Sequence, residues 1–145
     1  MIILTKELIR TRFKKYNALC FNKALKMPEI RIGKSNCLYG EFAYKKILDD
    51  GNLLRPHIWL AKNVEWTDYT LDAVLLHEMI HYYLVINKKG LKHNKYFRQE
   101  CDRIWKDFGI YVHQKKDKLN ASFIKSKKKK VSIFDRLRQF LCKIY

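Results

Sequence analysis

Acidic residues are few in this chain, and its cysteines are not arranged in pairs. The 145 residues include 14 Asp and Glu against 31 Lys and Arg, a formal net charge of +17. The four cysteines form no C-x-x-C pair, so neither a structural zinc site nor a redox motif can be inferred from them. No run of about twenty apolar residues occurs, so we predict no membrane-spanning helix. The apolar residues 1–4 are too short for the core of a signal peptide. The expected location is the cytoplasm, where the protein could associate with the nucleoid.

The positive charge is concentrated at the two ends of the chain. Residues 1–26 hold seven basic and one acidic side chain, net +6, and residues 113–145 hold eleven and two, net +9. Residues 27–112 hold thirteen and eleven, net +2. Basic ends on a nearly neutral body favour a polyanionic partner, because phosphate contacts release counterions without reading sequence. DNA, including single-stranded DNA, is the expected partner. The alternative is that the charge serves solubility alone.

The most informative motif is His77-Glu78-Met79-Ile80-His81, which has the form H-E-x-x-H. The apolar spacing around it predicts a helix, with N-cap candidates over residues 67–70 and an end near residues 87–90, where Gly90 suits the position after the helix. Side chains four residues apart leave one face of a helix, so both imidazoles can bind one metal ion while Glu78 reaches a polarised water. The alternative is two satisfied core histidines beside an unrelated glutamate.

A catalytic zinc needs a third protein ligand and keeps one position for water. The metzincin spacing places that ligand at residue 87, which is Asn87, so this subclass is excluded. Two candidates remain downstream. His93 follows the glycine-containing loop and precedes a second predicted helix, and Glu100 lies about two turns into that helix. We favour His93, because a loop residue at a helix entrance can turn onto the metal.

The chain resembles the SprT-like metalloprotease family, which includes Spartan. The resemblance rests on H-E-M-I-H followed by the segment His93-Asn94-Lys95-Tyr96-Phe97, on the Leu-x-x-Pro-x-Ile pattern of residues 25–30, and on Gly40 in a predicted strand. It spans roughly residues 5–112. It implies a zincin-like fold, Zn²⁺ bound by His77, His81 and His93, and Glu78 as general base. The implied activity is DNA-stimulated proteolysis of proteins crosslinked or tightly bound to DNA. Asn94 stands where the family usually has glycine, a tolerable departure because Asn accepts left-handed backbone angles better than most residues.

The predicted fold class is α+β, with the motif helix packed on a small sheet. We expect a helix over residues 5–25 ended by Pro28, with Leu8, Phe13, Tyr16 and Leu19 on one face. Strands are expected near 29–33, 39–44 and 57–62, with a turn at 49–52. A last helix near 94–108 is expected to bury Phe97, Cys101, Ile104, Trp105 and Phe108. His57 is interpreted as structural or exposed.

The last 33 residues are predicted to be an appendage to a catalytic domain of residues 1–112. Residues 125–130 form a basic linker, and residues 131–145 have the spacing of a short basic amphipathic helix that docks on the body, on DNA or on a membrane surface. The leading prediction is a zinc endopeptidase acting on DNA-bound proteins. The alternatives are a nucleic-acid-binding module with a structural, four-ligand zinc site, and a peripheral membrane metalloprotease. The sequence does not determine the oligomeric state.

Overall fold

The first helix covers one side of the core. The computed structural model describes residues 1–114, 119 and 121–124. Helix α1 runs over Lys6–Phe21, with Thr5 as its N-cap, and ends where Asn22 adopts a left-handed φ of 49°. The predicted end at Pro28 is therefore wrong, because the left-handed cap stops the helix earlier. The buried residues of α1 are Ile9, Phe13, Tyr16, Cys20 and Phe21, whereas Leu19 is exposed, contrary to prediction.

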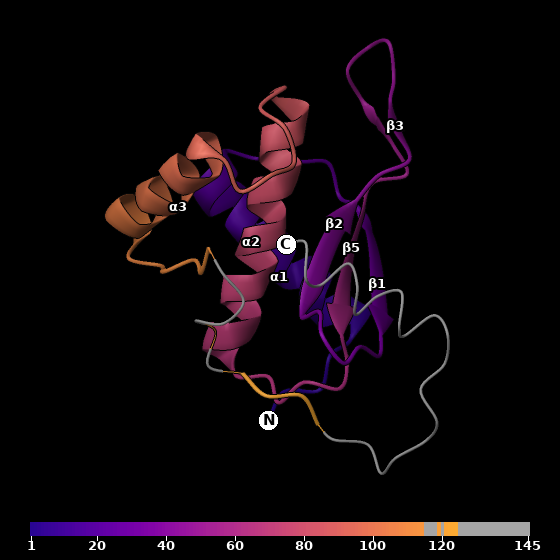
Figure 1. The fold of residues 1–145 in the computed structure, drawn as a ribbon, viewed down its shortest axis with the longest axis vertical. Helices are drawn as coiled ribbons and strands as arrows, with labels where there is room; N and C mark the ends of the chain where they lie inside the picture. Colours follow the sequence, from indigo (N-terminus) through magenta and orange to yellow (C-terminus); the bar gives the residue numbers. More distant parts are fainter. Residues whose placement is uncertain (115–118, 120, 125–145) are drawn as a thin grey trace.

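The three predicted strands form one mixed sheet, as expected for the α+β class. Their bounds are Glu29–Gly33 for β1, Gly40–Ala43 for β2 and His57–Ala61 for β5. The order is β1-β5-β2, with β5 parallel to β1 and antiparallel to β2. Ile30, Ile58, Leu60 and Ala61 are fully buried, so one face of this sheet forms part of the hydrophobic core. β2 is an edge strand, and it lies against the long central helix (Figure 1).

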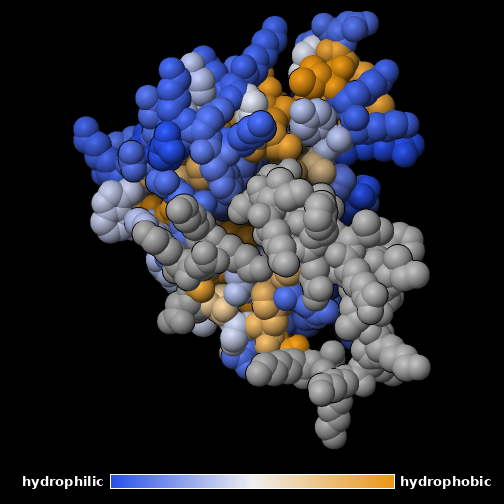
Figure 2. Space-filling model, in the orientation of Figure 1, coloured by the Kyte–Doolittle hydropathy of each residue, from blue (hydrophilic) through white to orange (hydrophobic). Residues whose placement is uncertain are grey.

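A short hairpin projects beyond the sheet. Its two strands were not predicted from the sequence. β3 (Lys46–Ile47) pairs with β4 (Leu53–Leu54), and the turn predicted between them is present at residues 49–51. The Asp50 carboxylate accepts a hydrogen bond from the Asn52 backbone N–H, and Gly51 has a φ of 81°. Figure 1 shows the hairpin extending away from the body, and Figure 2 shows apolar residues on it. Two-residue strands carry too short a pattern to be recognised by alternation.

The motif helix, α2 (Asp68–Ile86), lies at the centre of the molecule between the sheet and the other helices (Figure 1). Thr67 and Thr70 form a capping box at its start. Thirteen of its nineteen residues are buried, so it has no polar face. The residue directly after its C-cap Asn87 is Lys88, with a left-handed φ of 58°, and not Gly90 as predicted. Gly90 also has a positive φ, of 88°, but lies two residues further along the loop.

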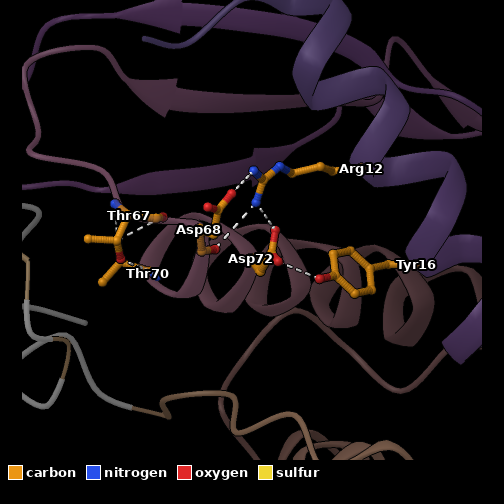
Figure 3. A network of polar contacts seen from close by, with 6 residues as sticks. All are labelled: Arg12, Tyr16, Thr67, Asp68, Thr70 and Asp72. Carbon is orange, nitrogen blue, oxygen red and sulfur yellow. Dashed lines mark hydrogen bonds and ion pairs between the residues drawn. The ribbon is translucent and has the colours of Figure 1, made fainter. Parts of the chain in front are cut away.

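An ion-pair network joins the start of α2 to α1 (Figure 3). The Arg12 guanidinium contacts the carboxylates of both Asp68 and Asp72, and the Tyr16 hydroxyl donates a hydrogen bond to Asp72. The Arg12 side chain is mostly buried, so its charge is compensated where it loses water. The network fixes the register of the two helices near the N-terminus of α2.

The second predicted helix is α3 (Lys95–Phe108), which ends at Gly109 in a left-handed conformation. Phe97, Cys101 and Ile104 are buried as predicted, but Trp105 is 55% exposed and Phe108 only partly buried. The prediction of Trp105 as a core residue is therefore wrong. No helix among the described residues is long and apolar enough to cross a membrane.

The described residues after α3 return to the body of the protein. Val112 and Leu119 are buried, and Phe123 forms an antiparallel bridge with Val64 and stacks on Tyr39 at a centroid distance of 4.6 Å. The predicted linker at 125–130 and helix at 131–145 lie outside the described residues.

Candidate metal centre

Three histidine side chains from two elements meet at one point beside α2. His77 and His81 lie one turn apart on the helix, and His93 comes from the loop that precedes α3. The Nε2 atom of His81 lies 3.2 Å from that of His77 and 2.9 Å from that of His93, and the His93–His77 distance is 2.9 Å. A tetrahedral zinc with Zn–N bonds of 2.0–2.1 Å sets its ligand nitrogens roughly 3.3 Å apart. The three nitrogens therefore form a group that could bind a metal ion.

The protonation of these imidazoles favours a bound cation. His77 Nδ1–H donates a hydrogen bond to the backbone carbonyl of His113 at 2.8 Å, which leaves the lone pair on Nε2. Burial lowers the pKa of His77 to about 4 and that of His81 to about 2, and the neighbouring histidines add to both shifts. Burial lowers the pKa of His93 as well. All three rings are neutral at pH 7, as metal ligands must be.

Phe97 forms the floor of the site. Its ring is fully buried, and its centroid lies 4.8 Å from that of His77, 4.7 Å from that of His81 and 4.5 Å from that of His93. One side chain therefore contacts all three imidazoles and limits their rotation. Because Phe97 is on the first turn of α3, it also ties the position of that helix to the metal centre.

Asn94 holds the loop that carries His93. Its side-chain oxygen accepts hydrogen bonds from the backbone N–H groups of Tyr96 and Phe97, and its amide donates to the Lys89 carbonyl at 2.9 Å. The backbone of Asn94 is not left-handed: it has a φ of −85°, and the residue serves as the N-cap of α3. An asparagine at this position is thus explained by capping, which needs an extended backbone and a short acceptor side chain.

The side chain of Glu78, a residue of α2, is buried against the edge strand β2. Burial raises the pKa of its carboxyl to about 8, and a hydrogen bond from the Phe42 backbone opposes part of that shift. A Cβ at Gly40 would lie 2.8 Å from Val74 Cγ1 and 3.2 Å from Glu78 Cγ. Glycine is therefore required for the close approach of β2 to this part of the helix.

The other candidates named from the sequence lie elsewhere. The Glu100 carboxylate is paired with Arg103 at 2.8 Å and is not part of the histidine group. His57 opens β5, and its Nδ1 lies 3.4 Å from the Arg55 carbonyl. The His113 carbonyl could not be identified from the sequence, since a backbone acceptor carries no side-chain signal. Phe97 was predicted only as a core residue, although it is the last residue of the His93–Phe97 segment on which the family resemblance rests.

A family model described as the SprT-like family matches residues 9–117, which include all three histidines and Glu78. No protein among the curated proteins matches the chain.

Proposed function

Since the chain belongs to the SprT-like family, we propose that it is a zinc-dependent metalloendopeptidase whose metal is bound by His77, His81 and His93. The observation that carries this proposal is the convergence of three Nε2 atoms within 3.2 Å of one another. Within residues 1–114, 119 and 121–124, no fourth His, Cys, Asp or Glu joins the group. Three protein ligands with a free position are typical of catalytic zinc, whereas structural zinc takes four. This favours an enzyme over a nucleic-acid module with a structural site.

The proposed chemistry divides between the metal and Glu78. A zinc ion held by His77, His81 and His93 would supply a Lewis acid and a polarised water. The Glu78 carboxylate accepts the proton of the water that attacks the peptide carbonyl, and then delivers it to the leaving amine. Burial raises the pKa of this carboxyl, which makes its carboxylate a stronger base for the first transfer. The His113 carbonyl and Phe97 keep the imidazoles in place during this cycle.

The edge strand β2 supplies a place for an extended peptide. Among the described residues, β2 pairs only with β5, so its other edge offers backbone groups to a further strand. The same strand packs against Glu78 through Gly40. A substrate segment that pairs with β2 by β-augmentation would therefore run past the general base.

The test of this function is Glu78→Gln. The amide keeps the shape of the side chain but cannot accept the proton, so the variant should retain zinc at one equivalent and lose proteolysis of an unstructured protein substrate. Metal content by atomic absorption and cleavage by gel electrophoresis give the two measurements. A fully loaded Glu78→Gln protein that still cleaves would remove Glu78 from the mechanism, and a wild-type protein without zinc would remove the metallopeptidase itself.

We further propose that the substrates are proteins bound or crosslinked to DNA in the cytoplasm, with the basic ends of the chain binding the phosphate backbone. The net charges of +6 and +9 on residues 1–26 and 113–145 support this. The loop that carries His93 adds exposed lysines next to the metal centre. These are Lys88, Lys89, Lys92 and Lys95.

DNA recruitment is tested by deleting residues 125–145, which hold eight basic and one acidic residue, net +7. This deletion leaves His113 and Phe123 in place. Affinity for single-stranded DNA should fall with salt at a log–log slope of about −0.7 per contacted phosphate, and the deletion should flatten that slope. Equal affinity of both proteins at two salt concentrations would contradict recruitment by this segment. Preferential binding to anionic liposomes would indicate a membrane instead.

A further inference from the structure

An open groove of about 470 Å³ lies between the three helices and the segment after α3. It is lined by Tyr16, Tyr69, Asp72, Trp105, Gly109, Ile110 and Tyr111. Trp105 is 55% exposed, Tyr69 53% and Tyr111 42%. Three large aromatic side chains exposed around one hollow are unusual on a protein surface, where an apolar cluster with a polar member usually marks a binding site.

The rings are arranged as walls rather than as a packed stack. The Trp105 and Tyr111 rings meet at 84° with centroids 6.0 Å apart, so they present differently directed faces. Indole and phenol faces carry a negative electrostatic potential that attracts a cation placed over them. The exposed ring faces of Tyr69, Trp105 and Tyr111, here called the aromatic cage, would therefore attract a cation placed over them.

Asp72 adds a carboxylate to this cage. One of its oxygens contacts Arg12 and the other accepts a hydrogen bond from Tyr16, and each oxygen keeps a further lone pair (Figure 3). Arg12 also pairs with Asp68, so the three ionised side chains sum to −1. None of the seven lining residues is basic. Asp72 is thus the one charged side chain among the lining residues, on a protein whose formal net charge is +17.

We propose that this groove binds a cationic side chain, arginine above all, of a protein partner. A planar guanidinium can stack on the Trp105 face while its N–H groups reach the free lone pairs of Asp72. A nucleotide is disfavoured, because its phosphate would meet the Asp72 carboxylate and no lining cation. The local charge is complementary to arginine or lysine, and opposite to what DNA binding needs.

The groove shares a wall with the metal centre. The Tyr111 ring packs on the His113 ring at 4.9 Å, the Tyr69 hydroxyl lies 3.5 Å from His113 Nε2, and the His113 carbonyl holds His77. A partner held in the groove by its arginine therefore lies next to the segment that positions a metal ligand. Binding in the groove requires neither metal nor catalysis. It can therefore be tested independently of the proposed peptidase activity.

The experiment compares two blocked tripeptides, acetyl-Gly-Arg-Gly-amide and its citrulline counterpart, which has the same shape without the charge. Affinity for the full-length protein is measured by calorimetry at 0.15 M salt, where the Debye length of about 8 Å screens the overall positive charge. The arginine peptide should bind about tenfold tighter. In NMR spectra it should shift one of the three tryptophan indole signals, namely the one missing from the Trp105→Leu protein.

Two variants separate the contributions of charge and ring. Asp72→Asn should abolish the preference for arginine over citrulline, while Asp107→Asn, which removes the same charge from an exposed position outside the groove, should leave it unchanged. Trp105→Leu keeps an apolar contact but has no π face. This variant should bind the arginine peptide only as weakly as it binds the citrulline peptide. Because Trp105 is exposed, this variant tests the groove even if Asp72→Asn fails to fold. The proposal would be overturned if wild-type protein bound the two peptides equally. It would also be overturned if thymidine monophosphate, and neither peptide, shifted the Trp105 indole signal.

Discussion

Replacing Phe97 by leucine should weaken metal binding more than it weakens the fold. The ring is fully buried and contacts all three imidazoles at centroid distances of 4.5–4.8 Å. Leucine fills part of that volume, so the metal-free protein should lose about 1–2 kcal/mol of unfolding free energy. The imidazoles would gain rotational freedom, and loss of a residue that orients metal ligands typically costs about 10–100-fold in metal affinity.

The two effects are separated by measuring both forms of the protein. At a fixed free zinc concentration, each tenfold loss of affinity removes about 1.4 kcal/mol of the stabilisation that zinc gives. Phe97→Leu should therefore lower the stability of the zinc-bound protein by about 1.4–2.8 kcal/mol more than that of the metal-free protein. Denaturant unfolding of both forms, together with competition against a chromophoric chelator, provides the numbers.

Ile104→Val is the matched control, since Ile104 is fully buried on the same helix about two turns beyond Phe97. It should cost about 0.5–1.5 kcal/mol in both forms and leave zinc affinity unchanged. If Phe97→Leu behaves in the same way, with zinc affinity within about twofold of wild type, then Phe97 is only a core residue and the reasoning about the floor of the site is refuted.

Two further predictions follow from the same geometry. His93→Ala should lose zinc under mild chelation while Glu100→Ala, whose carboxylate serves Arg103, should retain it; the reverse result would assign the third ligand to Glu100. Gly40→Ala should cost about 1–3 kcal/mol by overpacking against Val74 and should reduce turnover by displacing Glu78. Gly51→Ala is its control: it adds strain at a φ of 81° but meets no atom within 4 Å, so thermal melting should report a loss of stability without a loss of turnover.

The sequence predicted the parts of the site that depend on local geometry. His77 and His81 share a face because a helix repeats every 3.6 residues, whatever surrounds it. By contrast, the His113 carbonyl reaches His77 across 36 residues, and no side-chain pattern encodes such a contact. The role of Asn94 was not predicted either: its tolerance of left-handed angles is not used, and capping of α3 determines its conformation.

The errors in the predicted core have a common geometric origin. On α3, Phe97, Cys101 and Ile104 lie within a narrow stripe, whereas Trp105 is about 80° around the helix from Phe97 at about 100° per residue. On α1, Leu19 is displaced by about the same angle from the stripe formed by Ile9, Phe13, Tyr16 and Cys20. Helical spacing thus gives the centre of a buried face, while its width depends on the neighbouring elements. That dependence leaves Trp105 free to form the groove wall.

The sequence separations within the site imply an order of assembly during folding. The three histidines span 16 residues of one helix–loop unit, and His93 closes onto His81 over only 12. Loops of this length close quickly and at small entropic cost, so the ligand set is expected to form early and metal can stabilise it there. The packing around Glu78 includes Gly40, which is 38 residues away in the sequence. Gly40 lies on β2, a strand that pairs with β5. Pairings of this range are slow, because the entropy of closing a longer loop must be overcome first. On the proposed function, a newly made chain would bind its metal before Glu78 is in position, and would not cleave proteins, itself included, until the sheet is complete.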